Sequence, residues 1–442
     1  MIHKKKLALG IISQAISIFS PFLVIFISSK YLTAEVSSIW ILFLSTTSLL
    51  ILFDFGLSPT IIRYISYVAA GAQILTKQGI AGVTLSDTIN HALLNRLVKD
   101  FDTLYLILAV FAIVLLGGGG YYYFQLIVPA ELKEQVLYAW IVFSIGLILN
   151  IKYLYFIPLL TGLDKISATY IANVISKLIW VLMTVIFIYK NPSIIGLSFC
   201  YVISVLVGRV VMHVYLNYSQ NAWLRGKSVK CQNSSTLPYI YTNTWKLGIV
   251  GFGGFLINRG TTYLAGIVDS IDAAARYALS IQMFFSIMAV VNVLISQLMP
   301  MLSRARVQND KTLLRRASMR IYIFTVSCFT IAGLLFIFMN EWLLSLFKVN
   351  VHFLSESMLL FLGAVFLLEI SHSTCATIIT TKNEVPFVSA AIVSGVAVIL
   401  LSSCFSIVFS MGIAGLVLGQ GIVQLSYNNW KWPLALYKDL KC

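Results

Sequence analysis

The chain has 442 residues, of which 59% are hydrophobic and only 11% are charged, and its mean hydropathy is +0.91. Soluble globular domains have about 45–50% apolar and about 25% charged residues, so this composition excludes an ordinary soluble enzyme, a disordered chain and a collagen-like fibre. The net charge of +15 would favour nucleic acid as the partner of a soluble chain. In a membrane protein the same charge indicates basic loops beside anionic lipid, and we expect no nucleic-acid partner.

Apolar windows follow one another along the chain, separated by polar segments or by Pro and Gly. Each is close to the length of about 20 residues that a transmembrane helix needs. They cover about 7–29, 37–58, 102–124, 136–159, 167–189, 194–216, 247–268, 277–300, 320–342, 355–379, 386–409 and 412–430. The first window is longer than the apolar core of a signal peptide and precedes no A-x-A-like cleavage site, so we interpret it as a retained helix. The predicted fold class is an all-α polytopic membrane protein with 12 transmembrane helices.

Lysine and arginine are divided unevenly between the two sets of connections. With the N-terminus inside, 22 of the 31 Lys and Arg residues lie on the inner side, five lie outside and four lie within spans. Basic residues collect in the cytoplasmic loops of membrane proteins. We therefore predict that both termini are cytoplasmic. The external connections are short, whereas the long ones are internal.

The two halves of the chain share short strings at matching places. Pro59–Arg63 closes the second predicted span and Pro300–Arg304 closes the eighth, and two later pairs of strings match once a single insertion after the second span is allowed. Both halves begin and end on the same side, which predicts parallel repeats. We predict an N-terminal six-helix lobe at 1–219, a cytoplasmic linker at 220–245 and a C-terminal six-helix lobe at 246–442, with a central cavity between the lobes.

Four cationic side chains fall inside predicted spans. At the middle of a membrane helix each costs about 2.5–3.5 kcal/mol, so each is expected to face water, an anion or a partner. The alternative for each is that the side chain reaches out to the interface or hydrogen-bonds to a neighbouring helix. The four residues are Lys152, Lys177, Arg209 and Arg259.

We take two acidic side chains, Glu369 and Asp54, as the only plausible acidic partners for the four cations. Glu369 stands three residues before His372 in the most polar stretch of any span. Such a pair on one helix face can carry protons, or it can be a locally satisfied polar cluster. Asp54 precedes Gly56 and Pro59, which permit a helix break, so a conformational role is favoured over proton transfer. About two positive charges then remain for an anionic guest.

A stripe of small polar residues runs along the first predicted span. It contains Ser13, Ser17 and Ser20 beside Gln14. Such a stripe can line a cavity or pack against another helix, and packing is the interpretation that we favour.

No motif for catalysis or for a cofactor accompanies these residues. The six cysteines are single, with no CxxC spacing and no paired histidines nearby. The sequence also lacks a nucleophile elbow, paired catalytic carboxylates and a nucleotide-binding loop. We therefore expect a transporter with no cofactor or metal rather than an enzyme.

Several strings resemble a known family. The chain is similar to bacterial polysaccharide flippases, the Wzx-type O-antigen translocases of the multidrug/oligosaccharidyl-lipid/polysaccharide (MOP) exporter superfamily, along essentially its whole length. The connection after the second span is longer than is usual in that family. The strings are Asp54-Phe-Gly-Leu with Arg63 beyond it, Leu160-Thr-Gly-Leu-Asp-Lys165, Val268-Asp269 and Arg276-Tyr-Ala-Leu-Ser280.

The resemblance implies transport of undecaprenyl-diphosphate-linked oligosaccharide repeat units to the periplasmic leaflet of the bacterial inner membrane, by ion-coupled alternating access. Membrane lipids are then expected around the protein, and a polysaccharide polymerase and a chain-length regulator are possible partners. Under this hypothesis the substrate-binding residues are Lys152, Lys177, Arg209 and Arg259. The ion-coupling residues are Glu369, His372 and Asp54.

Two other functions remain open. A cation-coupled multidrug exporter of the same superfamily is one, but an organic cation needs an anionic site, whereas these spans offer cations. A membrane-embedded polysaccharide polymerase or glycosyltransferase is the other. Such an enzyme would normally need a sizeable external loop with catalytic charges, which the predicted topology lacks.

Overall fold

The computed structural model describes residues 2–72, 90–220, 237–308, 310–382 and 386–441. This part of the chain contains helices and no strands. Hydrocarbon offers no hydrogen-bond partners, so a spanning segment must satisfy its backbone groups internally, as a helix does. By their contacts the helices form two compact units, unit 1 (Met1–Leu32 and Thr46–Gly251) and unit 2 (Thr33–Ser45 and Phe252–Cys442).

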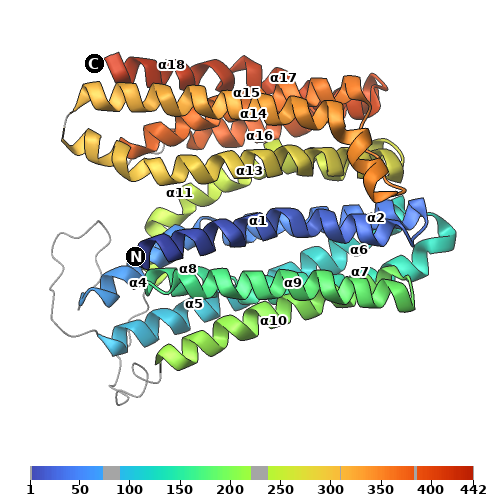
Figure 1. Ribbon diagram of the computed structural model, residues 1–442, viewed down its shortest axis with the longest axis horizontal. Coiled ribbons are helices and arrows are strands. Elements are labelled where there is room, and N and C mark those ends of the chain that lie inside the picture. Colours follow the sequence, from blue (N-terminus) through green and yellow to red (C-terminus); the bar gives the residue numbers. More distant parts are fainter. Residues whose placement is uncertain (1, 73–89, 221–236, 309, 383–385, 442) are drawn as a thin grey trace. The chain divides into compact units, whose positions relative to one another are not determined.

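Unit 1 is built around α1, α9, α10 and α7, with α5 and α8 packed on them (Figure 1). Its elements are α1 (Ile2–Ser29), η1 (Thr46–Ser48), α3 (Leu49–Asp54), α4 (Leu57–Ala69), α5 (His91–Ala112), η2 (Ile113–Gly120), α6 (Tyr121–Ile127), η3 (Ala130–Leu132), α7 (Lys133–Lys152), α8 (Phe156–Gly162), α9 (Ile166–Lys190), α10 (Ile194–Gln220) and all but the last turn of α11 (Leu237–Phe255). A core of fully buried side chains, among them Ile61, Leu97 and Leu160, joins α4, α5 and α8.

Unit 2 contains the two longest helices and the C-terminal segment. Its elements are α2 (Ala34–Ser45), η4 (Leu256–Gly260), α12 (Thr261–Val268), α13 (Ile271–Val307), α14 (Lys311–Phe347), α15 (Glu356–Ile379), η5 (Thr380–Lys382), α16 (Val388–Ser403), η6 (Cys404–Val408), α17 (Gly412–Ser426) and α18 (Asn428–Lys441). Helix α15 packs on α14 and α18, and α16 packs on α17. Helix η4 is a π-helix, a form that is frequent at functional sites.

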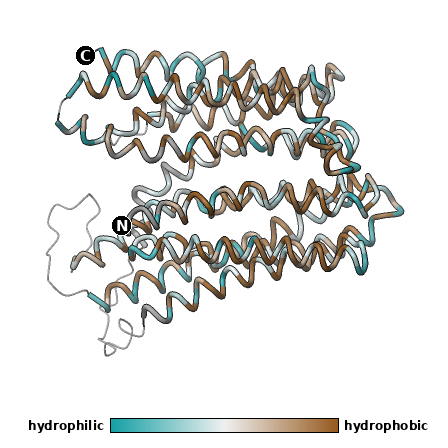
Figure 2. Tube along the Cα trace, viewed as in Figure 1, coloured by the Kyte–Doolittle hydropathy of each residue, from teal (hydrophilic) through white to brown (hydrophobic). Residues whose placement is uncertain are grey.

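The predicted fold class is confirmed. Ten helical segments in the described residues are long and apolar enough to cross a membrane. The other two predicted spans, 247–268 and 412–430, fall on helical segments from α11 to α12 and from α17 to α18. Figure 2 shows hydrophobic residues along the middle of the helices and hydrophilic ones towards their ends and connections. The chain is a multi-pass membrane protein.

Three helices extend beyond their predicted spans. Helix α5 begins at His91 rather than near residue 102, and α13 continues past residue 300 to Val307, so the string Pro300–Arg304 does not close that helix. Helix α14 has 37 residues and is about 55 Å long, against about 30 Å of hydrocarbon. Hydropathy locates the apolar centre of such a helix but not the turns that extend into water.

The second predicted span, 37–58, corresponds to a helical segment from Ala34 to Asp54, in which η1 joins α2 to α3, and to the start of α4 beyond a break at Phe55 and Gly56. Helix α2 belongs to unit 2, where it packs on α13, whereas α3 and α4 belong to unit 1. The predicted lobes, 1–219 and 246–442, are defined by sequence repeats along the chain. The two units are instead defined by which helices pack together. The two divisions differ at Thr33–Ser45 and at residues 237–251, and residues 221–236 of the predicted linker lie outside the described residues.

The polar stripe of the first span is a packing surface. The amide of Asn173 on α9 donates to the hydroxyl groups of Ser13 and Ser17 on α1. One helical turn away, Gly10 lies against the ring of Tyr170, where an added Cβ would be 3.1 Å from a ring carbon. Small residues allow the two helices to approach closely, which confirms the packing interpretation.

Candidate functional site

The chain breaks its helix next to Asp54. Helix α3 ends at this residue, and Phe55 and Gly56 both adopt left-handed backbone angles, with φ of 43° and 69°. The Asp54 carboxylate accepts a hydrogen bond from the Ser58 hydroxyl at 2.6 Å and another from the Tyr105 hydroxyl at 3.2 Å. A carboxylate at the start of α4 satisfies donors of the first helical turn. The break therefore lies where Gly56 and Pro59 predicted one.

Lys152, at the end of α7, has a carboxylate partner. Its ammonium nitrogen lies 2.6 Å from Asp102 Oδ1 and 3.0 Å from the Asp102 carbonyl oxygen. The Tyr155 hydroxyl donates to the same carboxylate oxygen at 2.9 Å. Treating Asp54 and Glu369 as the only acidic partners was therefore wrong. Asp102 lies eleven residues into α5, which packs against α7.

Arg209, on α10, is 9% exposed and contacts neutral groups. Its guanidinium donates to the side-chain oxygen of Asn150, and to the Asn150 carbonyl oxygen at 3.3 Å. The Met212 sulfur lies 3.6 Å from another guanidinium nitrogen. These contacts orient the cation but leave its charge unneutralised.

Lys177 and Arg259 have aromatic and amide neighbours. The Lys177 ammonium lies 4.7 Å from the centre of the Trp180 ring. The Arg259 guanidinium lies 4.0 Å from the centre of the Phe285 ring and donates to Gln282 Oε1 at 3.1 Å. Cation–π contacts contribute about 0.5–2 kcal/mol and carry no opposite charge.

The four cations thus fall into two groups. Lys152 is paired with a carboxylate, whereas in the described part of the chain no carboxylate lies within ion-pair distance of Lys177, Arg209 or Arg259. An unpaired cation in a membrane span is costly and usually marks a ligand or ion pathway. These three side chains are the stronger candidates for contact with an anion.

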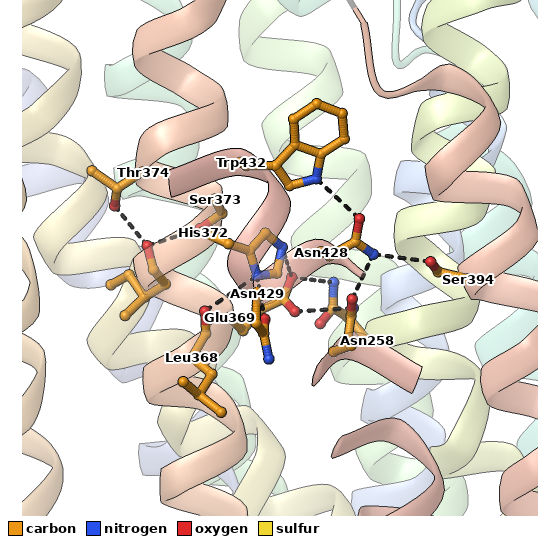
Figure 3. A network of polar contacts seen from close by, with 12 residues as sticks. Asn258, Leu368, Glu369, His372, Ser373, Thr374, Ser394, Asn428, Asn429 and Trp432 are labelled. Carbon is orange, nitrogen blue, oxygen red and sulfur yellow. Dashed lines mark hydrogen bonds and ion pairs between the residues drawn. The ribbon is translucent and has the colours of Figure 1, made fainter. Parts of the chain in front are cut away.

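Unit 2 contains a polar network around Glu369 (Figure 3). Glu369 is 7% exposed on α15, and its Oε2 accepts a hydrogen bond from the Gln424 amide at 3.1 Å. The Asn258 amide, in the π-helical η4, donates to Oε1 at 3.5 Å. The Nε2 atom of His372 lies 3.7 Å from the same oxygen. The carboxylate is therefore surrounded by neutral donors and one titratable ring.

The protonation of His372 follows from its two acceptors. Its Nδ1 lies 3.2 Å from the Leu368 carbonyl oxygen and 2.7 Å from the side-chain oxygen assigned to Asn429 (Figure 3). A carbonyl oxygen can only accept, so Nδ1 carries a proton. Nε2 then faces Glu369 Oε1, and a proton added between these two atoms would bridge the ring and the carboxyl group.

A second row of amides orients the donor to Glu369. The Asn428 amide donates to Gln424 Oε1 at 2.7 Å and to the Ser394 hydroxyl at 2.9 Å. Its carbonyl oxygen accepts from the Trp432 indole at 3.0 Å (Figure 3). With its oxygen engaged, the Gln424 amide has its nitrogen turned to Glu369. Helices α15, α16, α17 and α18 all contribute to this network.

The sequence argument missed the amides on α17 and α18 and the carboxylate on α5. One signal was present, because Gln420, Gln424 and Asn428 recur every four residues in an apolar segment and so share a helix face. Asp102 gave no comparable signal. In the ranges that the structure describes, no cluster of three or more His, Cys, Asp or Glu residues suited to a metal ion occurs.

Comparisons with known proteins show which fold the chain has. No protein-family model matches the sequence, and no curated protein matches it. Among solved structures, an inward-facing multidrug resistance MATE family transporter of the MOP superfamily matches with a TM-score of 0.67 and 13% identity, over 96% of this chain and 95% of that one. An outward-facing structure of such a transporter matches with a TM-score of 0.63 and 12% identity, over 99% and 96%.

The chain has the fold of MOP superfamily transporters. A third match is a MOP superfamily transporter from Pyrococcus furiosus, with a TM-score of 0.57 and 12% identity over 99% of this chain and 96% of that one. Its description states that reverse polarity of the binding pocket suggests a different function. At these identities the likeness shows the fold, and the substrate must be argued from the charged residues.

Proposed function

We propose that the protein is an alternating-access transporter that flips undecaprenyl-diphosphate-linked oligosaccharide repeat units from the cytoplasmic to the periplasmic leaflet of the bacterial inner membrane. One observation carries the choice of an anionic substrate. Lys177, Arg209 and Arg259 lie in predicted spans, and among the described residues none of them has a carboxylate partner. A polysaccharide polymerase and a chain-length regulator belong to this proposal as possible partners.

The chemistry of the substrate fits these side chains. A diphosphate offers several negatively charged oxygens, which form strong hydrogen bonds with guanidinium and ammonium groups. An anion bound at any one of these cations would offset the cost of keeping that cation within the membrane. The polyprenyl tail can stay in the hydrocarbon while the sugars cross.

Proton coupling is assigned to the pair formed by Glu369 and His372. The Nε2 atom of His372 faces Glu369 Oε1 at 3.7 Å, so a proton taken up by the pair would lie between a ring nitrogen and a carboxyl oxygen within the network of unit 2. A proton biases two transport states only if it binds them with different affinity. Asp54 is assigned a different role, because its break between α3 and α4 is a place where backbone angles can change.

The test is complementation of a deletion strain, read out as surface polysaccharide and as lipid-linked intermediates on each membrane face. The variants are Lys177→Gln, Arg209→Gln and Arg259→Gln, and the control is Arg276→Gln. Arg276 is already paired with Asp272 at 2.7 Å. We expect loss of polymer and repeat units held at the cytoplasmic face in the three variants at normal protein level. Normal polymer in all three would reject the anionic site.

A multidrug exporter is the second candidate, because the MATE matches are described as multidrug resistance transporters. Efflux of organic cations by the intact protein distinguishes the two functions. Efflux that persists when the three cations are replaced by Gln, together with unchanged surface polysaccharide in the deletion strain, would favour the drug exporter.

A further inference from the structure

A cavity of about 240 Å³ lies within unit 2, between α14, α15 and α18. Figure 1 shows α14, α15 and α18 close together, with the C-terminus at one end of α18. The volume is slightly below the range of about 300–1,000 Å³ that is usual for sites of drug-sized ligands. None of the residues discussed above as a substrate or coupling residue lines it.

The cavity has a charged mouth and apolar walls. Arg315 lies near the start of α14 and Lys441 at the end of α18, and both side chains are exposed. Further from these ends the lining is apolar, with Leu436 and Cys375 only 6% and 2% exposed. From Arg315 to Tyr322 the distance along α14 is about 10 Å at 1.5 Å per residue. The cavity is therefore amphipathic along its depth.

The two cations at the mouth have no acidic partner among the described residues. The nearest carboxylate along α18, that of Asp439, is engaged by Arg306 at 2.8 Å and by Lys382. The Lys441 ammonium lies 5.0 Å from the centre of the Tyr437 ring. An anion at the mouth would meet two cations that no described carboxylate neutralises.

Ser318 supplies a second, independent observation. It lines the cavity, its side chain is fully buried, and its hydroxyl has no hydrogen-bond partner within the described residues. Ser318 is the third residue after Arg315, which places it about 4.5 Å further along the helix. A buried hydroxyl without a partner costs about 1–3 kcal/mol, so an acceptor supplied by a ligand would stabilise this site.

We propose that this cavity binds an anionic phospholipid of the surrounding membrane. The phosphate contacts Arg315 and Lys441, an ester oxygen of the glycerol accepts from Ser318, and an acyl chain packs against Leu436 and Cys375. A small soluble anion could pair with the two cations but would leave the apolar walls in contact with water. An uncharged hydrocarbon could cover those walls but would leave the two cations unpaired. Basic pockets between membrane helices at the cytoplasmic side favour such acidic headgroups.

The experiment measures phosphatidylglycerol bound to the purified, delipidated full-length protein by native mass spectrometry. The first variant is Arg315→Gln with Lys441→Gln, and its matched control is Arg316→Gln with Lys438→Gln on the same two helices. Each basic residue near an anionic lipid contributes about a fivefold change in affinity, so we expect binding at least tenfold weaker in the first variant and within about twofold of wild type in the control.

A second variant tests the apolar part without changing charge. Cys375→Leu enlarges a side chain at the floor of the cavity and is expected to weaken phosphatidylglycerol binding severalfold at an unchanged melting temperature. Equal losses in the two charge variants, equally tight binding of phosphatidylethanolamine, or unaltered binding in Cys375→Leu would each overturn the proposal. Binding of a polyprenyl phosphate in place of phosphatidylglycerol would overturn it as well.

Discussion

The two units surround their acidic residues in different ways. In unit 1, Asp102 faces the Lys152 ammonium at 2.6 Å. In unit 2, Glu369 is surrounded by the amides of Gln424 and Asn258 and the imidazole of His372. A carboxylate held by a lysine has little reason to take up a proton, whereas a carboxylate beside histidine can exchange one.

This difference separates an ion pair from a polar network. Removing either charge of Asp102 and Lys152 would leave the other charge unpaired, at a cost. Glu369 and His372 instead form the pair to which we assign proton exchange. Unit 2 is therefore where we expect pH to act on the protein, and unit 1 is where we expect stability to depend on a charge pair.

The largest effect is expected from Glu369→Gln. The variant keeps the hydrogen-bonding shape of the side chain but cannot release a proton, so we expect transport to fall at least tenfold and to lose its dependence on the pH gradient. The measurement is the rate of repeat-unit export at imposed pH gradients. Glu356→Gln, at the exposed start of the same helix, is the matched control. If the Glu369→Gln variant is as active and as pH-dependent as wild type, Glu369 is not the residue that couples transport to protons.

The next effect tests the charge pair of unit 1. Lys152→Met and Asp102→Asn, made singly, are each expected to lower the free energy of unfolding by about 1–2 kcal/mol, because each leaves the other charge partly buried and unpaired. The size is reduced because the Asp102 side chain is 47% exposed. The double variant is expected to recover part of the loss. Losses that simply add in a double-mutant cycle would show that the pair is not coupled.

A smaller effect is expected at the helix break. Gly56→Ala forces a side chain into a left-handed backbone angle, with φ of 69°, and we expect a loss of about 1 kcal/mol in the free energy of unfolding. Gly119→Ala is the control, since its added Cβ would have 3.9 Å to the nearest side chain. The melting temperatures of both variants are to be compared in one detergent. A stable Gly56→Ala variant would mean that the break rearranges easily.

The smallest effect concerns Asp439, which lies beyond the last predicted span. Burial alone would raise the pKa of its carboxyl, but hydrogen bonds and charge from Arg306 and Lys382 outweigh burial and hold the pKa below its usual value. A depressed pKa stabilises the fold above the unfolded value of about 3.9, and this contribution is lost as the pH falls through the folded value. Unfolding measured from pH 6 to pH 3 is expected to show this loss in wild type and not in Asp439→Asn.

The sequence determined the membrane fold and the charged residues to consider. Apolar windows of about 20 residues are a direct consequence of the thickness of hydrocarbon, and the bias of Lys and Arg towards one set of loops predicts orientation. The cost of a charge in hydrocarbon selected these candidates without any structure: Lys152, Lys177, Arg209, Arg259 and Glu369. The break at Gly56 followed from local backbone preferences.

Only the tertiary structure decided which charges are paired. Asp102 and Lys152 are fifty residues apart, and Glu369 meets Gln424 fifty-five residues further along the chain. Hydropathy and spacing describe one helix at a time, whereas a pair depends on which helices pack together and at what register. The packing of α2 on α13, and the cavity between α14, α15 and α18, have the same origin. Partners of intramembrane charges are set by interhelical contacts, which a single sequence does not encode in any local pattern.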